Sequence, residues 1–272
     1  MASAATPDMQ HLTAAGRRLE YYWTAPHDGD SPALVFLHEG LGSAGLWRDF
    51  PAQLTAETGL PALVYSRYGY GGSDVLAGPR NVDYMHVEAQ EALPVIRDAL
   101  DLDDVILVGH SDGASIALIH AAQHPVRGLI LEAPHLFVED ESIAGIEDAK
   151  AAYETTDLSD RIARRHTDGE ATFRGWNDIW LSPAFRDWNI EEYLPAITCP
   201  TLVIQGVDDE YGTEAQPATI GRESSGPVDA VMVPDCGHAP HRDATEGVLD
   251  VMADFANALT DETSDEEDAE EV

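Results

Sequence analysis

The stretch from Val105 to Ala117, VILVGHSDGASIA, decides the fold. It opens with a continuous run of branched apolar residues, which is typical of a strand buried on both faces of a parallel sheet. A helical pattern follows directly, and Ser111 at the junction is flanked at two-residue spacing by Gly109 and Gly113. In this context the G-x-S-x-G pattern predicts a nucleophile elbow, a turn so tight that larger side chains beside the serine would collide. We expect Ser111 to lie over a helix N-terminus, where developing negative charge is favoured.

Apolar runs and helical patterns alternate along the rest of the chain, which predicts an α/β fold with a doubly wound, mostly parallel sheet. The expected strands are 19–24, 33–38, 62–66, 105–109, 128–132, 201–205 and 230–233. The expected helices are 45–57, 83–100, 112–123, 214–223 and 244–259. Residues 135–197 break the alternation, with helical segments and an aromatic-rich stretch but no convincing strand. We therefore expect a core formed by residues 1–134 and 198–259, with an inserted helical cap at 135–197.

Two further segments follow expected strands before the elbow. Residues 38–43 read HEGLGS, and residues 65–73 read YSRYGYGGS. With these segments and the elbow, the chain resembles the α/β-hydrolase superfamily over roughly residues 15 to 258, and specifically its prokaryotic members with a serine nucleophile. The resemblance implies a catalytic serine, acid and histidine in that order along the chain.

The acid is expected in the loop after the strand at 201–205, where the sequence continues as Gly206-Val-Asp-Asp-Glu. The family pattern Gly-x-x-Asp selects Asp209 as the carboxylate that orients the base. Asp208 and Glu210 are rivals, because all three acids belong to one loop of an acidic chain.

The base is expected in the loop after the last strand, where residues 233–243 read VPDCGHAPHRD. The family places its histidine in a loop of this kind, commonly after a glycine and just before the final helix. This selects His238, which follows Gly237, and leaves His241 as the rival.

Acyl transfer also requires N–H donors aimed at the oxyanion. The resemblance implies that one donor is the backbone N–H of Asp112, the residue after the nucleophile. The other comes from the loop after the expected strand at 33–38, where the pattern points to Gly40. This loop departs from the family because Glu39 replaces a glycine, which leaves Leu41 as an alternative donor. We expect the Glu39 carboxylate to turn away from the oxyanion and to hold the loop by hydrogen bonds.

Other side chains are expected around this site. Trp176 and Trp180 are four residues apart, so they share one face if the segment is helical, and they are candidates for lining a substrate pocket or for packing the cap. His110 precedes the nucleophile and is a third candidate for the pocket. His38 and Arg67 are expected to brace loops and not to take part in the chemistry.

The charge balance is strongly acidic, with 50 Asp and Glu against 15 Lys and Arg and a formal net charge of −35. Lys150 is the only lysine, so the other basic residues are arginines. Mutual repulsion of this size is tolerable where salt screens it, since the Debye length falls to about 3 Å at 1 M salt. The composition resembles proteins of halophiles that accumulate KCl. The sign of the charge disfavours nucleic acids and anionic membranes as partners.

The remaining features limit location and cofactors. No apolar run is long enough for a membrane helix, and the first residues show no signal peptide pattern. Cys199 and Cys236 form no metal or redox pattern, so we expect a cytoplasmic protein with free thiols. We expect neither a cofactor nor a metal, because no phosphate-binding loop, dinucleotide fingerprint or metal-ligand cluster is found. Residues 260–272 are nearly all acidic or polar and are expected to be disordered, and the oligomeric state, monomer or dimer, stays open.

Three functions fit these residues. The first is a serine hydrolase that cleaves a small carboxylic ester or lactone. The second is a carbon–carbon bond hydrolase of the meta-cleavage product type, although the proline of its oxyanion loop is missing here. The third is a ligand-binding protein on the hydrolase scaffold, against which the full set of serine, acid and histidine argues. Epoxide and haloalkane hydrolases are disfavoured, because they place an aspartate where this chain has Ser111.

Overall fold

The computed structural model describes residues 8–270 apart from residues 28 and 30, with the backbone alone described for 262–270. Its centre is an eight-stranded sheet in the order β1-β2-β4-β3-β5-β6-β7-β8. β2 is antiparallel to its neighbours β1 and β4, and the pairs from β4 across to β8 are parallel. The strands are β1 (Gln10–Ala14), β2 (Arg17–Trp23), β3 (Ala33–Leu37), β4 (Ala62–Tyr65), β5 (Val105–His110), β6 (Gly128–Glu132), β7 (Thr201–Gly206) and β8 (Val228–Val233). The prediction of a mostly parallel α/β sheet is confirmed.

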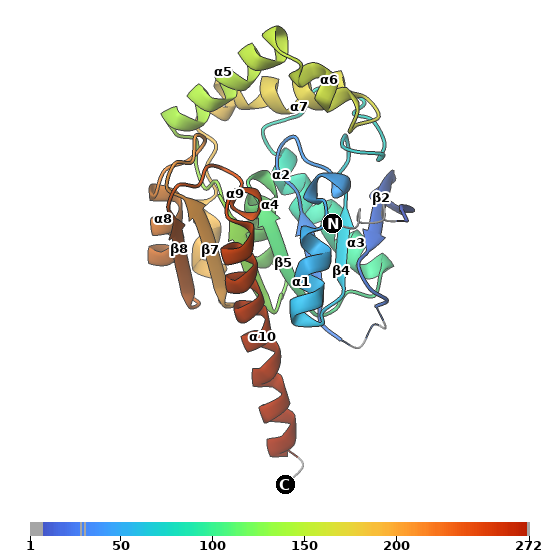
Figure 1. The fold of residues 1–272 in the computed structure, drawn as a ribbon, viewed down its shortest axis with the longest axis vertical. Coiled ribbons are helices and arrows are strands. Elements are labelled where there is room, and N and C mark those ends of the chain that lie inside the picture. The colour runs from blue at the N-terminus through green and yellow to red at the C-terminus, as the bar shows by residue number, and fades with distance from the viewer. Residues whose placement is uncertain (1–7, 28, 30, 271–272) are drawn as a thin grey trace.

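Helices cover both faces of this sheet, so the protein has two apolar cores. Helices α1 (Phe50–Thr58) and α10 (Thr245–Glu270) pack against each other on one face (Figure 1). The other face carries the continuous helical segment formed by α2, η2 and α3, together with α4 and α8. Their bounds are α2 (Tyr84–Val87), η2 (Glu88–Ala92), α3 (Leu93–Ala99), α4 (Asp112–Ala121) and α8 (Ala215–Glu223). Two short elements, η1 (Ala44–Trp47) and α9 (Pro240–Asp243), lie in loops.

The interval between β6 and β7 is helical, as expected for residues 135–197. It contains α5 (Asp140–Thr155), α6 (Leu158–Ala163), α7 (Gly169–Trp180), η3 (Pro183–Phe185) and η4 (Glu191–Ala196). We call α5, α6 and α7 the cap helices. They form a layer across the end of the sheet to which the parallel strands point (Figure 1). Ligand sites of open α/β sheets lie at this carboxyl end, so the cap helices are placed over the expected site.

Two segments differ from the sequence-based expectations. β1 was not expected, because this edge strand is mostly exposed and has no apolar run to mark it. Residues 260–270, expected to be disordered, continue helix α10 through Glu270. This helix is anchored by buried side chains such as Val248 and Met252, and the glutamate and alanine of its last turns are good helix formers. Residues 271 and 272 of the predicted tail lie outside the described residues. Within the described part of the chain, no helix combines the length and apolar character needed to cross a membrane.

Candidate active site

Ser111 lies at the sharp junction between β5 and α4, and its backbone is strained. Its φ is 55° and its ψ is −119°, a region that non-glycine residues rarely adopt outside functional sites. A Cβ on Gly109 would lie 2.6 Å from the Cα of Ala114, and a Cβ on Gly113 would lie 2.0 Å from the carbonyl oxygen of Leu37. Both flanking glycines are therefore required by close backbone contacts, as the elbow pattern predicts.

His238 is hydrogen-bonded to Asp209, with Nδ1 2.8 Å from Oδ1 and 3.0 Å from Oδ2. The Asp209 side chain is only 1% exposed, and it accepts two further bonds, from Gln205 Nε2 at 2.6 Å and from the backbone N–H of Tyr211 at 2.8 Å. Burial opposes the charge, but His238 and these donors outweigh it and lower the pKa of Asp209. Asp209 is thus held ionised, and His238 donates Nδ1–H to it and keeps Nε2 as the base.

The rivals considered from the sequence have other surroundings. Asp208 is exposed. Glu210 accepts the backbone N–H of His238 at 3.2 Å, so it steadies the histidine loop without touching the ring nitrogens. His241 pairs with a buried glutamate described below. The geometry brings together Asp209 and His238, not their rivals.

The loop after β3 is braced by a buried arginine. Arg67 donates from Nη2 to the carbonyl oxygens of His38 and Glu39, at 2.9 and 3.0 Å. The His38 ring donates from Nδ1 to the Glu39 carbonyl at 2.7 Å and accepts the backbone N–H of Arg67 at Nε2, at 3.1 Å. These two bonds require a neutral ring. Burial and the adjacent guanidinium supply it, because they lower the pKa of His38 well below its usual value.

Glu39, the residue that departs from the family pattern, folds back over its own loop. Its carboxylate oxygen Oε2 lies 3.6 Å from Nδ1 of His110, and a Cβ on Gly42 would meet the same oxygen at 2.3 Å. Burial opposes the charge, but His110 and the other nearby histidines hold the pKa of Glu39 below its usual range. Glu39 still lines the pocket, with its charge engaged by His110.

The expected oxyanion donors lie next to the nucleophile. Gly40 and Leu41 both line the pocket, and Asp112 is the first residue of α4. The Asp112 carboxylate accepts the hydroxyl of Tyr84 at 2.6 Å in the protein interior, so its side chain does not serve the pocket. Trp176 of α7 packs so closely over Gly40 that a Cβ there would lie 2.1 Å from the indole Nε1. The choice between Gly40 and Leu41 as donor stays a prediction.

Two more histidines pack against His238. His110 has its ring centroid 5.2 Å from that of His238, and its Nε2 lies 2.6 Å from the His238 carbonyl oxygen. His135, just after β6, lies 5.6 Å from His238 and 5.1 Å from Trp180, measured between ring centroids. Burial and the neighbouring His238 lower the pKa of His135 to about 3, so this ring is neutral near pH 7. Sequence reasoning missed the proximity of His135, since no motif surrounds it.

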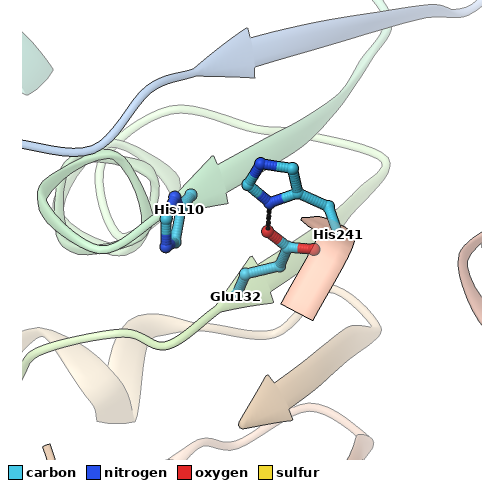
Figure 2. Close-up of side chains that lie close together, drawn as sticks. All are labelled: His110, Glu132 and His241. Atoms are coloured by element: carbon cyan, nitrogen blue, oxygen red, sulfur yellow. Dashed lines mark hydrogen bonds and ion pairs between the residues drawn. The ribbon is translucent and has the colours of Figure 1, made fainter. Parts of the chain in front are cut away.

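Figure 2 shows a buried cluster of His110, Glu132 and His241 beside the elbow. One ligand atom from each lies within 4.8 Å of the others, so these described residues are spaced to hold a metal ion. However, His241 Nδ1 is hydrogen-bonded to Glu132 Oε2 at 2.6 Å, and His110 Nε2 is bonded to the His238 carbonyl. A cation would have to displace such contacts. We interpret the cluster as an anchor that ties the His238 loop to the end of β6.

A cavity of about 600 Å³ opens over Ser111 and His238, under the cap helices. This is the size range of sites for small molecules. Trp176 and Trp180 line it from α7, together with His110 from the core. Both tryptophans are also largely buried, at 7% and 2% exposure. The two tryptophans thus pack the cap and also line the cavity, and their contact with a substrate stays a prediction.

Comparison with known proteins agrees with this geometry. The model of the Alpha/beta hydrolase family matches residues 34–251, most of the chain. The chain belongs to the alpha/beta hydrolase family. This hydrolase is 35% identical over 252 residues to a 2-succinyl-6-hydroxy-2,4-cyclohexadiene-1-carboxylate synthase of Enterobacter sp. (strain 638), with 82% of this chain and 90% of the relative covered.

Two other proteins that this chain resembles carry different names from that enzyme. A proline iminopeptidase of Levilactobacillus brevis is 25% identical over 246 residues, covering 74% of this hydrolase and 82% of the relative. The solved structure of Est816, described as an N-acyl homoserine lactone degrading enzyme, matches with a TM-score of 0.67 at 22% identity, covering 90% of this chain and 100% of that one. At that identity the likeness shows the fold alone. Family membership supports hydrolase chemistry but does not choose the substrate.

Proposed function

We propose that this hydrolase cleaves a small carboxylic ester or lactone through an acyl-enzyme on Ser111. The observation that carries the proposal is the bond from Asp209 to His238, which lines the same pocket as the strained Ser111. A serine hydroxyl is a weak nucleophile near neutral pH, and it needs a base that a carboxylate orients.

In the acylation step, Ser111 Oγ attacks the carbonyl carbon while its proton moves to Nε2 of His238. The bond to the alkoxy oxygen then breaks, and that oxygen takes the proton from His238 and becomes an alcohol. In the deacylation step, water attacks the acyl carbon as His238 takes its proton. The proton returns to Ser111 Oγ when the acid leaves. Asp209 stays ionised throughout and stabilises the imidazolium.

Negative charge on the carbonyl oxygen needs donors in both steps. The backbone N–H of Asp112 and that of Gly40 or Leu41 are the proposed pair. Loss of one such donor lowers kcat by roughly 10²–10³. Arg67 supports the proposal indirectly, because it fixes two carbonyl groups of the loop that carries the second donor.

The nucleophile is tested with a fluorophosphonate probe, which phosphonylates activated serines. We expect labelling of the wild type and of a Ser142→Ala control, whose serine lines the same pocket, and no labelling of Ser111→Ala. Labelling that survives in Ser111→Ala contradicts the assignment.

The bond cleaved is tested separately, with p-nitrophenyl esters, simple lactones, a meta-cleavage dienoate and a prolyl p-nitroanilide in molar KCl. We expect turnover of esters or lactones, with one acid released per bond cleaved. An enzyme that is labelled at Ser111 and turns over only the dienoate or the anilide overturns the proposed bond type but retains the nucleophile.

A further inference from the structure

Basic residues are rare in this chain, but they are enriched among the residues that line the active-site pocket. The lining consists of 25 residues, of which five are arginines, and these are Arg48, Arg161, Arg164, Arg165 and Arg242. The whole chain has 15 basic residues against 50 acidic ones. A third of the basic side chains therefore lies in less than a tenth of the sequence, around one cavity of an otherwise strongly negative molecule.

Most of these arginines have no partner in the part of the chain that the structure describes. Elsewhere in the molecule, several arginines pair with carboxylates, and the pairs are Arg127–Asp104, Arg174–Glu170, Arg186–Asp140 and Arg222–Glu223. At the pocket, Arg161 pairs with Asp157 at 3.5 Å. The other four pocket arginines have no side-chain ion pair or hydrogen bond among the described residues. In a chain so rich in carboxylates, unpaired guanidinium groups around a cavity are free to bind a ligand.

The same pocket is lined by three carboxylates, fewer than its five arginines, and each carboxylate already has a partner in the protein. Glu39 lies against His110, Glu210 accepts the backbone N–H of His238, and Asp243 accepts the backbone N–H of Gly237 at 3.0 Å. The three acids hold the loops around the site, and the five arginines that line the same pocket are exposed.

The arginines flank the pocket from both sides. Arg161, Arg164 and Arg165 belong to α6 and the residues directly after it, whereas Arg48 follows η1 and Arg242 lies in α9. The cap wall of the pocket also includes the apolar residues Ile146, Leu158 and Ile162. The pocket thus combines apolar side chains of the cap helices with exposed positive charge among its lining residues.

We infer that the substrate carries an anionic group, a carboxylate or a phosphate, in addition to its scissile ester or lactone. This inference rests on the proposed function. The guanidinium fork binds both kinds of oxyanion in a bidentate manner. The acyl or alcohol chain lies on the apolar cap wall, and the anionic end meets Arg164, Arg165 or Arg242. The same charges disfavour substrates with a free ammonium group.

A matched pair of esters tests the inference. p-Nitrophenyl hydrogen adipate carries a carboxylate, and p-nitrophenyl methyl adipate has the same chain capped as a neutral ester. At constant ionic strength we expect wild-type kcat/KM to favour the anionic ester by about tenfold or more, a value typical of a hydrogen bond to a charged group. Arg164→Gln/Arg165→Gln and Arg242→Gln should reduce this ratio and change the neutral ester by less than about twofold. The control is Arg174→Gln, an exposed arginine of α7 outside this pocket.

Direct binding separates the inference from the proposed function. Calorimetry with adipate and with inorganic phosphate should show binding to wild type and to Ser111→Ala, weakened in the pocket-arginine variants but not in Arg174→Gln. Tighter binding of adipate assigns the site to carboxylates, and tighter binding of phosphate assigns it to phosphate groups.

If neither ester is cleaved but an anion still binds through these arginines, ester hydrolysis fails and the anionic substrate class stands. Equal cleavage of both esters, with no arginine-dependent anion binding, overturns the inference.

Discussion

Asp209 shows how one side chain is distinguished from two neighbours of the same charge. Of the three acids in its loop, it is the one whose carboxylate is buried and receives His238, Gln205 and the Tyr211 N–H. Donors of this kind favour the ionised form and fix its orientation at once. The family pattern Gly-x-x-Asp points to the same residue, whereas the three acids cannot be told apart by residue type alone.

The acid is tested by comparing Asp209→Asn with Asp208→Asn. In Asp209→Asn the amide offers an N–H where His238 Nδ1 donates, so the ring adopts the wrong tautomer, and kcat should fall by roughly 10³–10⁴. Asp208→Asn should keep kcat within about twofold, since the side chain is exposed. Steady-state rates with one p-nitrophenyl ester give the comparison, and circular dichroism checks the fold. Equal losses in the two variants would show that Asp209 has no special role.

At the scale of elements, the sequence predicts those parts whose cause is local. β5, β6 and β7 each contain a continuous apolar run, and the elbow after β5 has its glycines within two residues of Ser111. Contacts between distant segments that no family pattern marks were not predictable. Glu132 and His241 are 109 residues apart, and the pairing depends on how β6 and α9 meet in space. β1 was missed for a related reason, because it is defined by its pairing with β2 and not by its own composition.

The contact between the loop after β3 and α7 gives a prediction at this scale. Gly40→Ala places a methyl group against the indole of Trp176, which should displace the loop and lower kcat by about tenfold or more. In a Trp176→Ala background the indole is absent, so adding Gly40→Ala there should lower kcat by less than it does in the wild type. Such a double-mutant cycle isolates the coupling between the two positions. Additive effects would mean that the loop and the cap helix act independently.

At the scale of the whole molecule, the interior contains histidines that fold in the neutral form. Burial lowers the pKa of His120 to about 4, and the ring is fixed by Arg97 at Nε2 and by the Ala89 carbonyl at Nδ1, at 3.0 and 2.8 Å. The unfolded chain binds a proton there below its ordinary pKa of about 6.5, whereas the folded chain does so only below about 4. Each such histidine therefore destabilises the fold progressively as the pH falls between these two values.

Urea unfolding at a series of pH values tests this effect. In the wild type, the free energy of unfolding should fall below about pH 6.5, with His120 contributing at most about 1.4 kcal/mol per pH unit. His120→Gln should make the slope between about pH 6 and pH 4 shallower. The matched control is His11→Gln, which changes an exposed histidine on β1 and should keep the wild-type slope. If the free energy of unfolding of His120→Gln falls with decreasing pH as steeply as that of the wild type, groups other than His120 cause the acid sensitivity.

The net charge of −35 predicts that salt stabilises the whole molecule. At about 0.1 M salt the Debye length of about 10 Å lets neighbouring carboxylates repel each other, whereas at about 1 M it is about 3 Å and most of this repulsion is screened. We expect the free energy of unfolding to rise with KCl over this range. Glu147→Gln/Asp148→Asn/Glu154→Gln removes three exposed charges from α5 and should raise stability at low salt, with little effect at high salt. If the wild type is equally stable at both KCl concentrations, salt does not stabilise the protein. If the neutralised variant keeps the salt dependence of the wild type, these surface carboxylates do not cause it.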